Sequence, residues 1–94
     1  MTHTIHEGSN SFYIGENEKR AIAEITYVYR DDHTIDVNHT FVDPSLRGGG
    51  VARQLFDKVI EKARNENLKI IPTCSYVYTQ FEKNPDLADL RANR

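Results

Sequence analysis

The sequence predicts an α+β fold, in which an antiparallel meander of β-strands leads into one strand–helix–strand unit and a closing helix. Two observations support this class. Up to residue 42, short segments rich in β-branched and aromatic side chains are separated by polar turns, as in a meander. From Val51 onward, apolar residues recur at helical spacing, and a further short strand and helix follow.

Four strands are expected in the first part of the chain. Their ranges are 3–7, 11–15, 20–30 and 34–42. Only short turns separate these segments, so antiparallel pairing of neighbours is the simplest arrangement. In the fourth segment apolar and polar residues alternate, which predicts that His39 and Phe41 share one side of the strand with Ile35 and Val37.

A helix is expected over residues 51–64, fading at 65–67. Its apolar stripe consists of Val51, Ala52, Leu55, Phe56, Val59, Ile60 and Ala63. Residues 68–73 then form a short buried strand, in which Pro72 fits only at an edge or a bulge. A helical crossover makes its two flanking strands parallel. Ser75 is expected to cap a last helix over residues 76–83, which Asn84 and Pro85 end.

The composition restricts the class of protein. A chain of 94 residues supports one core, so we expect a single domain over residues 1–94. The net charge of −2 argues against a nucleic-acid binder, which needs a surplus of Lys and Arg. There is no apolar run of roughly 18 residues to cross a membrane and no secretory signal in MTHTIHEGSN. Cys74 is the one cysteine, which fits a reducing compartment, and a cytoplasmic protein is expected.

Residues 43–52, DPSLRGGGVA, place three glycines at the start of the predicted helix. The first N–H groups of a helix lack intrahelical partners and lie at the positive end of its dipole, so they can bind an anion. Arg47 adds a charge suited to phosphate oxygens. The alternative is a tight connection in which glycine supplies only a positive φ. The run of three glycines and the lack of a Ser, Thr, Asp or Asn cap favour anion binding.

Two common nucleotide motifs do not fit this turn. No Lys-Ser or Lys-Thr pair follows the glycines, as a nucleoside-triphosphate loop requires. A second strand–helix–strand unit with an acidic residue, as in a dinucleotide fold, is also missing. The remaining interpretation is a site for a pyrophosphate that carries neither a hydride nor a γ-phosphate.

The stretch FVDPSLRGGGVARQLFDKVIEKARNENLKII resembles the coenzyme A-binding core of the GNAT-type N-acetyltransferases. The hallmark of that family is Gln or Arg, two residues, Gly, one residue, then Gly or Ala, and Arg47, Gly50 and Ala52 match it. The segments HTFVDP, PTCSYV and NPDLADL and the short length resemble the minimal single-domain branch of the family. The resemblance covers roughly residues 5–90 and implies an acetyl-CoA-dependent transferase.

The resemblance also implies a binding mode for acetyl-CoA, with no metal. The pyrophosphate would be held by the backbone of the turn, that is by Arg47, Gly48, Gly49, Gly50, Val51 and Ala52. The strand that ends at Phe41 and Val42 would pair its backbone with the pantetheine arm. In the family this strand and the next parallel strand splay apart to leave a slot for the thioester, and Cys74 would lie near the end of that slot.

Two residues are catalytic candidates. Cys74 could accept the acetyl group covalently, line the thioester pocket, or simply be a small buried residue, and we favour the pocket-lining role. His39 could deprotonate the acceptor amine, because an imidazole titrates in the useful pH range, with water-mediated deprotonation as the rival. On an apolar face, a lone histidine is more often a core or ligand-contact residue than a catalyst.

Other aromatic and imidazole side chains remain. Tyr76 and Tyr78 are expected to flank the slot in ordinary packing, which we favour. The functional alternative is contact with coenzyme A or proton donation to the leaving thiolate. No Cys or carboxylate stands at ligand spacing from His3, His6 or His33, so no metal is predicted.

Typical family members insert helices after the first strand, and these helices cover the acceptor site. Here only residues 8–10 separate the first two strands, so the acceptor cleft is expected to be open. We therefore expect transfer to a primary amine of a small molecule, peptide or protein, by a monomer or with a partner protein over the cleft. The alternative is a non-catalytic acyl-coenzyme A-binding or interaction module.

Overall fold

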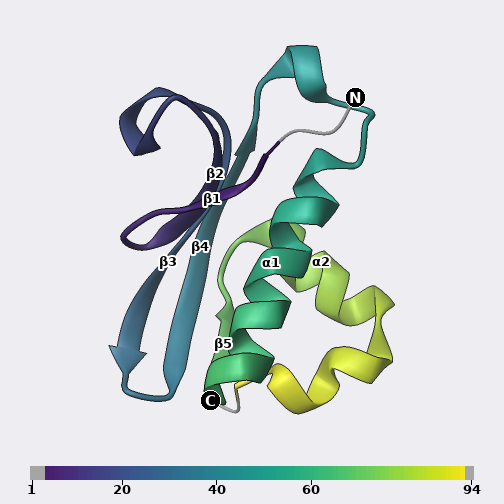
Figure 1. Ribbon diagram of the computed structural model, residues 1–94. Helices are drawn as coiled ribbons and strands as arrows, with labels where there is room; N and C mark the ends of the chain where they lie inside the picture. Colours follow the sequence, from purple (N-terminus) through teal and green to yellow (C-terminus); the bar gives the residue numbers. More distant parts are fainter. Residues whose placement is uncertain (1–3, 93–94) are drawn as a thin grey trace.

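The computed structural model describes residues 4–92, and its elements follow the predicted order (Figure 1). The strands are β1 His6–Glu7, β2 Ser11–Gly15, β3 Ala21–Asp31, β4 Thr34–Val42 and β5 Lys69–Pro72. The helices are α1 Val51–Glu66 and α2 Ser75–Lys83, with 3₁₀ turns η1 Glu18–Arg20, η2 Pro44–Leu46 and η3 Pro85–Leu90. The predicted first strand is shortened to two residues, and its first position, His3, lies outside the described residues.

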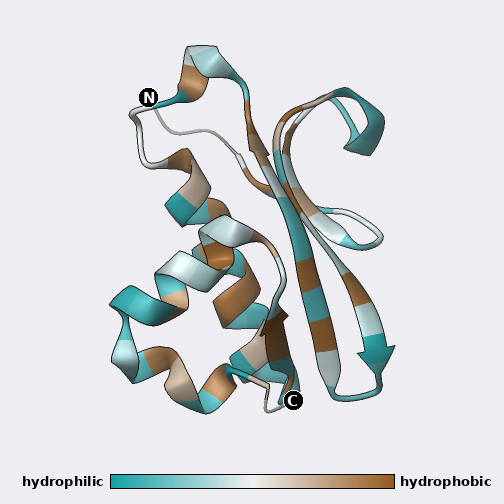
Figure 2. Cartoon of the chain, turned by 180° about the vertical axis from the view of Figure 1, so that it is seen from behind, coloured by the Kyte–Doolittle hydropathy of each residue, from teal (hydrophilic) through white to brown (hydrophobic). Residues whose placement is uncertain are grey.

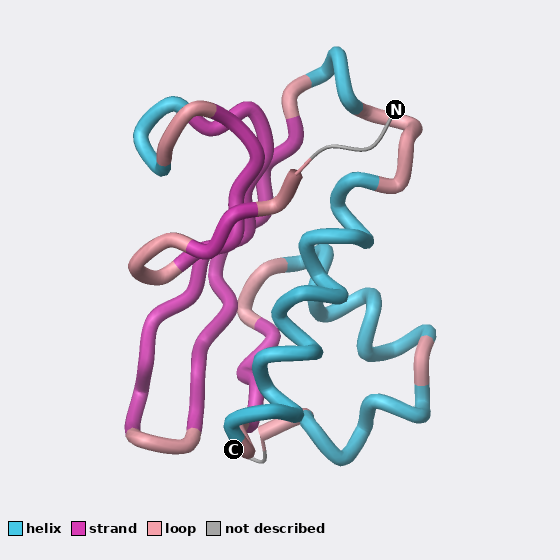
Figure 3. The backbone as a smooth tube through the Cα atoms, viewed as in Figure 1, coloured by secondary structure: helices cyan, strands magenta, loops and turns pink. Residues whose placement is uncertain are grey.

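The five strands form one mixed sheet in the order β1-β2-β3-β4-β5. The first four strands pair antiparallel, and β4 pairs with β5 in parallel. Both α-helices lie on the same side of the sheet (Figures 1 and 3). The predicted α+β class, with a meander leading into a strand–helix–strand unit and a closing helix, is confirmed. Pro72 is the last residue of an edge strand, where its missing N–H is tolerated.

The core lies between α1 and the inner side of the sheet, where apolar residues of both layers meet (Figure 2). The residues of α1 that are fully buried are Leu55, Phe56, Val59 and Ala63. Ala52 and Ile60, which complete the predicted stripe, are only half-buried. Because Ala52 lies at the first turn of α1, its partial exposure leaves that end of the helix open beside the sheet.

A β-bulge interrupts β4 at Asn38. Thr26 pairs with His39, but the next residue of β3, Tyr27, pairs with Val37, so Asn38 is an additional residue in β4. An additional residue reverses the alternation of side chains beyond it. In β4, the odd-numbered side chains therefore face the core before Asn38, and the even-numbered side chains face it after Asn38.

The predicted placement of His39 and Phe41 beside Ile35 and Val37 is wrong for this reason. Ile35 and Val37 are fully buried, whereas Phe41 is 38% exposed and the His39 side chain is 55% exposed. Thr40 takes the inward position instead. The alternation of apolar and polar residues continues through Asn38, but the regular pairing of β4 with β3 is interrupted there.

The C-terminal segment also differs from the prediction in two details. Helix α2 begins at Ser75, and its N-cap is Cys74, which makes no side-chain cap hydrogen bond. The predicted Ser75 cap is therefore wrong. After Asn84 the chain continues as η3, in which Leu87 and Leu90 are buried against the core. No pattern in the sequence predicts this turn.

Lys62 connects α1 to the sheet. Its side chain is 11% exposed, its Nζ lies 2.9 Å from Glu66 and 3.4 Å from Glu7, and it stands over the ring of Tyr27. Burial lowers the pKa of Lys62, but the hydrogen bond to Glu66 and the nearby tyrosines outweigh burial and raise the pKa above its ordinary value of 10.5. A raised pKa of a basic group stabilises the fold below the unfolded-state pKa, and this stability is lost as the pH rises further.

We therefore expect Lys62→Gln to lower the free energy of unfolding at pH 7 by about 1 kcal/mol, since both carboxylate partners are half-exposed. Urea unfolding should also show the wild type losing stability above pH 10.5 more steeply than the variant. Lys58→Gln, which removes an exposed lysine of the same helix, is the control. Equal unfolding midpoints for both variants at pH 7 would contradict this role of Lys62.

Candidate active site

The turn before α1 has an unusual backbone. Gly48 and Gly50 have φ angles of 89° and 75°, in the left-handed region that only glycine adopts without strain. Gly50 is the N-cap of α1, and no side chain caps the helix. Within the described chain, the first backbone hydrogen bond into α1 runs from the Gln54 N–H to the Gly50 carbonyl, at 3.1 Å. The preceding amides of the helix are thus left for a ligand.

The three glycines do not have the same role. A Cβ built on Gly48 or Gly50 would meet no atom within 4 Å, so the space beside both residues is open. A Cβ on Gly49 would make an ordinary contact with the Leu46 carbonyl at 3.6 Å, and its φ is not positive. Gly48 and Gly50 therefore fit the interpretation in which glycine supplies a positive φ. The open space beside both residues also leaves room for a ligand.

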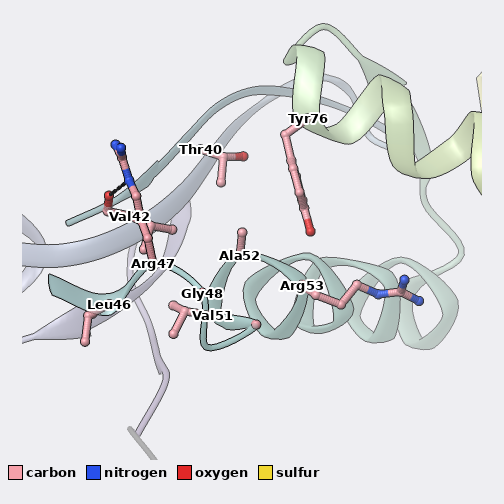
Figure 4. Close-up of a pocket in the computed structure, with 10 residues that line it drawn as sticks. Thr40, Val42, Leu46, Arg47, Gly48, Val51, Ala52, Arg53 and Tyr76 are labelled. Carbon is pink, nitrogen blue, oxygen red and sulfur yellow. Dashed lines mark hydrogen bonds between the residues drawn. The ribbon is translucent and has the colours of Figure 1, made fainter. Parts of the chain in front are cut away.

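Arg47 borders the turn from the side of β4. Its Nε donates to the Val42 carbonyl at 3.2 Å, which holds the guanidinium against the end of the strand (Figure 4). Upstream, Asp43 accepts from the N–H and the hydroxyl of Ser45 at 2.9 and 2.8 Å. The Ser45 N–H donor lowers the pKa of Asp43, so this carboxylate stays charged and continues to hold the chain that leads to Arg47.

A cleft of about 420 Å³ opens beside this turn. Figure 4 shows the end of β4 and the first turn of α1 on two of its sides, with Tyr76 of α2 pointing in. It is lined by Thr40, Val42, Leu46, Arg47, Gly48, Gly50, Val51, Ala52, Arg53 and Tyr76. The cleft therefore joins the free end of a helix, two arginines and an apolar wall.

The parallel pairing of β4 and β5 ends at Val37 and Pro72. One more contact follows, from the Cys74 N–H to the Val37 carbonyl at 2.9 Å. Beyond it β4 continues without β5, so the two strands separate as expected for a slot. Across this separation the Cys74 thiol lies 3.3 Å from the Thr40 hydroxyl.

Thr40 was missed by the sequence analysis. It lines the cleft and contacts Cys74, yet the alternation in β4 predicted that it would face away. The signal that finds it is the bulge at Asn38, which is set by the pairing with β3. A pattern within one strand cannot reveal it.

The two tyrosines of α2 separate in the structure. Tyr76 lines the cleft and packs edge-on against Phe56, with ring centroids 6.4 Å apart, and burial raises its pKa. Tyr78 is 47% exposed, lies 5.1 Å from the Arg91 guanidinium and does not line the cleft. The predicted placement of Tyr78 beside the slot is wrong. Residues 76 and 78 lie two positions apart, and therefore on different sides of a helix.

The histidines do not converge. His39 lies on the side of the sheet away from α1, with its Nε2 3.9 Å from a carboxylate oxygen of Glu24. His6 packs near the ring of Tyr13, with centroids 5.4 Å apart.

Within residues 4–92, no group of three or more His, Cys, Asp or Glu side chains could hold a metal ion. No helix among these residues is long and apolar enough to cross a membrane.

Comparisons with known proteins agree with the fold. A model of the GCN5-related N-acetyl-transferase family matches residues 11–90. Protein NATD1 of Xenopus tropicalis is 33% identical over 63 residues, which cover 67% of this chain and 58% of that protein. Protein NATD1 of Homo sapiens is 32% identical over 63 residues, which cover 67% and 56%. The matched region thus spans less than two thirds of the length of these relatives.

Solved structures give the same result. A GCN5-like protein from Staphylococcus aureus, solved in solution by NMR, is 42% identical, with a TM-score of 0.79 over 97% of this chain and 89% of that chain. A GNAT family acetyltransferase from Elizabethkingia anophelis, solved with acetyl-CoA bound, has a TM-score of 0.55 at 19% identity over 80% of this chain and 51% of that chain. The second likeness shows the fold alone.

The family model covers most of the chain, and the sheet, the glycine turn and the separated strands agree with it. The chain belongs to the GCN5-related N-acetyltransferase family.

Proposed function

We propose that this protein transfers the acetyl group of acetyl-CoA to a primary amine. The observation that carries the proposal is the uncapped start of α1, where left-handed Gly48 and Gly50 leave open space beside free amides and Arg47. A pyrophosphate suits this position, because the helix dipole, the amides and the guanidinium all favour negative charge. The family membership supports coenzyme A as the molecule that carries this pyrophosphate.

The backbone of β4 supports a position for the pantetheine arm. In an antiparallel pair, the N–H and C=O of one residue point to the same neighbour. Asp43 donates its N–H to the Ile22 carbonyl of β3 at 2.8 Å, so Phe41, two positions earlier, also directs its backbone toward β3. Thr40 and Val42 direct theirs toward the slot. We therefore infer that the Thr40 backbone and the Val42 N–H, rather than Phe41, pair with the pantetheine amides, since the Val42 carbonyl already accepts from Arg47.

The transfer itself is a substitution at the thioester carbonyl. The neutral amine attacks the acetyl carbon, a C–N bond forms and the C–S bond breaks. Coenzyme A leaves as a thiolate, which takes a proton, and the proton of the amine passes to a base. The hydroxyls of Tyr76 and Thr40 both belong to residues that line the cleft, and that of Tyr76 is our candidate donor to the leaving thiolate. His39, on the outer side of β4, is our candidate base.

Thiol release tests this proposal directly. The protein is mixed with acetyl-CoA and a panel of amines, namely alkylamines, polyamines and lysine-containing peptides, and free coenzyme A is measured. Amine-dependent release supports the proposal. Saturable binding of acetyl-CoA without release by any amine would instead establish a non-catalytic binder, which the open outer side of the sheet favours as the second candidate.

Cys74→Ala is expected to keep turnover within about threefold of the wild type, because we assign Cys74 to the wall of the slot. The thiol contacts Thr40 at 3.3 Å and has no Lys, Arg or His among its hydrogen-bond partners in the described chain, so no base is placed there to deprotonate it. Turnover and the intact mass of the protein after incubation with acetyl-CoA are the two measurements. An acetylated protein that disappears in the alanine variant, together with loss of turnover, would contradict this assignment.

His39→Gln is expected to lower kcat by about 100-fold, the usual contribution of a general base, and to leave the affinity for acetyl-CoA unchanged. The side chain is 55% exposed, so the substitution should not disturb the fold. His33→Gln removes a turn histidine and is the control. Unchanged kcat in His39→Gln would assign the deprotonation to water.

A further inference from the structure

The face of the sheet opposite α1 and α2 has a mixed apolar and acidic surface. We define the outer face by side chains of β3 and β4 that alternate with the core residues: Ile22, Glu24, Thr26, Val28, His39 and Phe41. Ile22 and Phe41 are 39% and 38% exposed and lie at the same end of the strand pair. Glu24 stands directly opposite Phe41 in the register. An apolar patch is thus followed at once by a carboxylate.

A groove of about 350 Å³ continues the outer face away from the apolar patch. It is lined by Ser9, Asn10, Ser11, Glu18, Glu24, Thr26, Tyr27, Val28 and Asn38. Two carboxylates, several hydroxyl and amide groups and no Lys or Arg line it, so its charge is negative. Glu18 is held by the Ser9 N–H at 2.7 Å, and the Thr26 hydroxyl is held by Asn38 at 2.7 Å.

Glu24 is the carboxylate best placed to receive a cation. Its side chain is 26% exposed, which is enough for a ligand to reach it and low enough to strengthen an ion pair. Its neighbour within the protein is His39, at 3.9 Å, a distance too long for a hydrogen bond. A cation that contacts Glu24 therefore competes with a weak internal interaction.

We propose that the outer face docks a lysine-bearing segment of another polypeptide, with the lysine ammonium at Glu24 and an adjacent apolar side chain on Ile22 and Phe41. Charge complementarity selects the lysine. The apolar patch selects an apolar residue next to that lysine, which a free amine lacks. A second copy of this chain that docks through the same face is a poorer occupant, because it would bring Glu18 and Glu24 against like charges. This inference rests on the proposed function and names the acceptor class for the same site.

The position of β4 connects the outer face to the slot. Thr40 faces the cleft, while its neighbours His39 and Phe41 face outward, so residues 38–42 border both surfaces. Beyond Val37 no β5 residue pairs with this part of β4. A lysine docked at Glu24 therefore lies across one strand from the proposed position of the thioester, on the side that no helix covers.

Amide NMR of the full chain tests this proposal with two blocked peptides, one that contains a Phe-Lys pair and one with norleucine in place of lysine. We expect the lysine peptide to shift amides of β3 and β4 and to bind about tenfold more tightly than the norleucine peptide. Glu24→Gln should remove this difference. Glu61→Gln, which removes an exposed carboxylate of α1, should preserve it.

Three results would overturn the proposal: equal affinity of the two peptides, shifts confined to the helical side, or binding of free alkylamines only. A Glu24→Gln variant that keeps the full preference for lysine would also overturn it, and its amide spectrum shows whether it is folded. The same samples are titrated with acetyl-CoA. If acetyl-CoA does not bind, the proposed function fails, while the peptide comparison without it still decides whether the outer face docks lysine.

Discussion

Gly50→Glu is expected to weaken the binding of coenzyme A by at least about a thousandfold. The new carboxylate would stand at the helix start, among the amides that we assign to the pyrophosphate. Two like charges about 4 Å apart repel by roughly 4 kcal/mol at an effective dielectric constant of 20, which corresponds to that loss. Titration calorimetry of wild type and variant with coenzyme A measures the effect.

Gly50→Asn separates this electrostatic effect from backbone strain. The φ of Gly50 is 75°, and asparagine tolerates the left-handed region better than other residues. A Cβ at this position meets no atom within 4 Å, so the asparagine should fold with a modest loss of affinity. If Gly50→Glu binds coenzyme A as well as Gly50→Asn does, the turn serves only as a connection.

Phe56→Ala is expected to lower the free energy of unfolding by about 3–5 kcal/mol, the usual cost of truncating a buried phenylalanine. Phe56 is fully buried and packs edge-on against Tyr76 and Phe81, with ring centroids 6.4 and 5.9 Å away. It therefore joins α1 to α2 and supports the tyrosine that lines the cleft. Urea unfolding measures the stability, and the affinity for coenzyme A should fall as Tyr76 loses its support.

Phe56→Leu keeps most of the volume and is the matched variant. We expect it to cost less than about 2 kcal/mol and to keep coenzyme A affinity closer to the wild type. A loss below about 1 kcal/mol in Phe56→Ala would show that the packing of Phe56 does not support the fold. An affinity equal to the wild type in that variant would show that it does not support the cleft.

Much of the fold could be predicted because its signals are local. The strands at 11–15 and 34–42 and the start of the helix at Val51 each follow from the period of their own residues and were found at those positions. The parallel pairing of β4 with β5 follows from the crossover by α1. The 3₁₀ turn η3 could not be predicted, because its stability depends on burying Leu87 and Leu90 in a core made elsewhere in the chain.

The site could be predicted at the turn and not along β4. Arg47, Gly48 and Gly50 are adjacent in sequence, so one motif brings them to the cleft. The position of Thr40 in the cleft and of His39 on the outer face depends on one additional residue in β4 that only the pairing with β3 reveals. To predict site residues on strands therefore requires the strand register, whereas to predict those on the turn requires only the sequence.

We propose above that the start of α1 binds the pyrophosphate of coenzyme A while β4 holds its pantetheine arm. An amide NMR titration of the protein with coenzyme A tests it most directly, because the proposed ligands are backbone N–H groups. We expect saturable binding, with the largest shifts at residues 48–53 and smaller ones at Thr40 and Val42. Saturable binding that leaves residues 48–53 unshifted, or no binding at all, would contradict it.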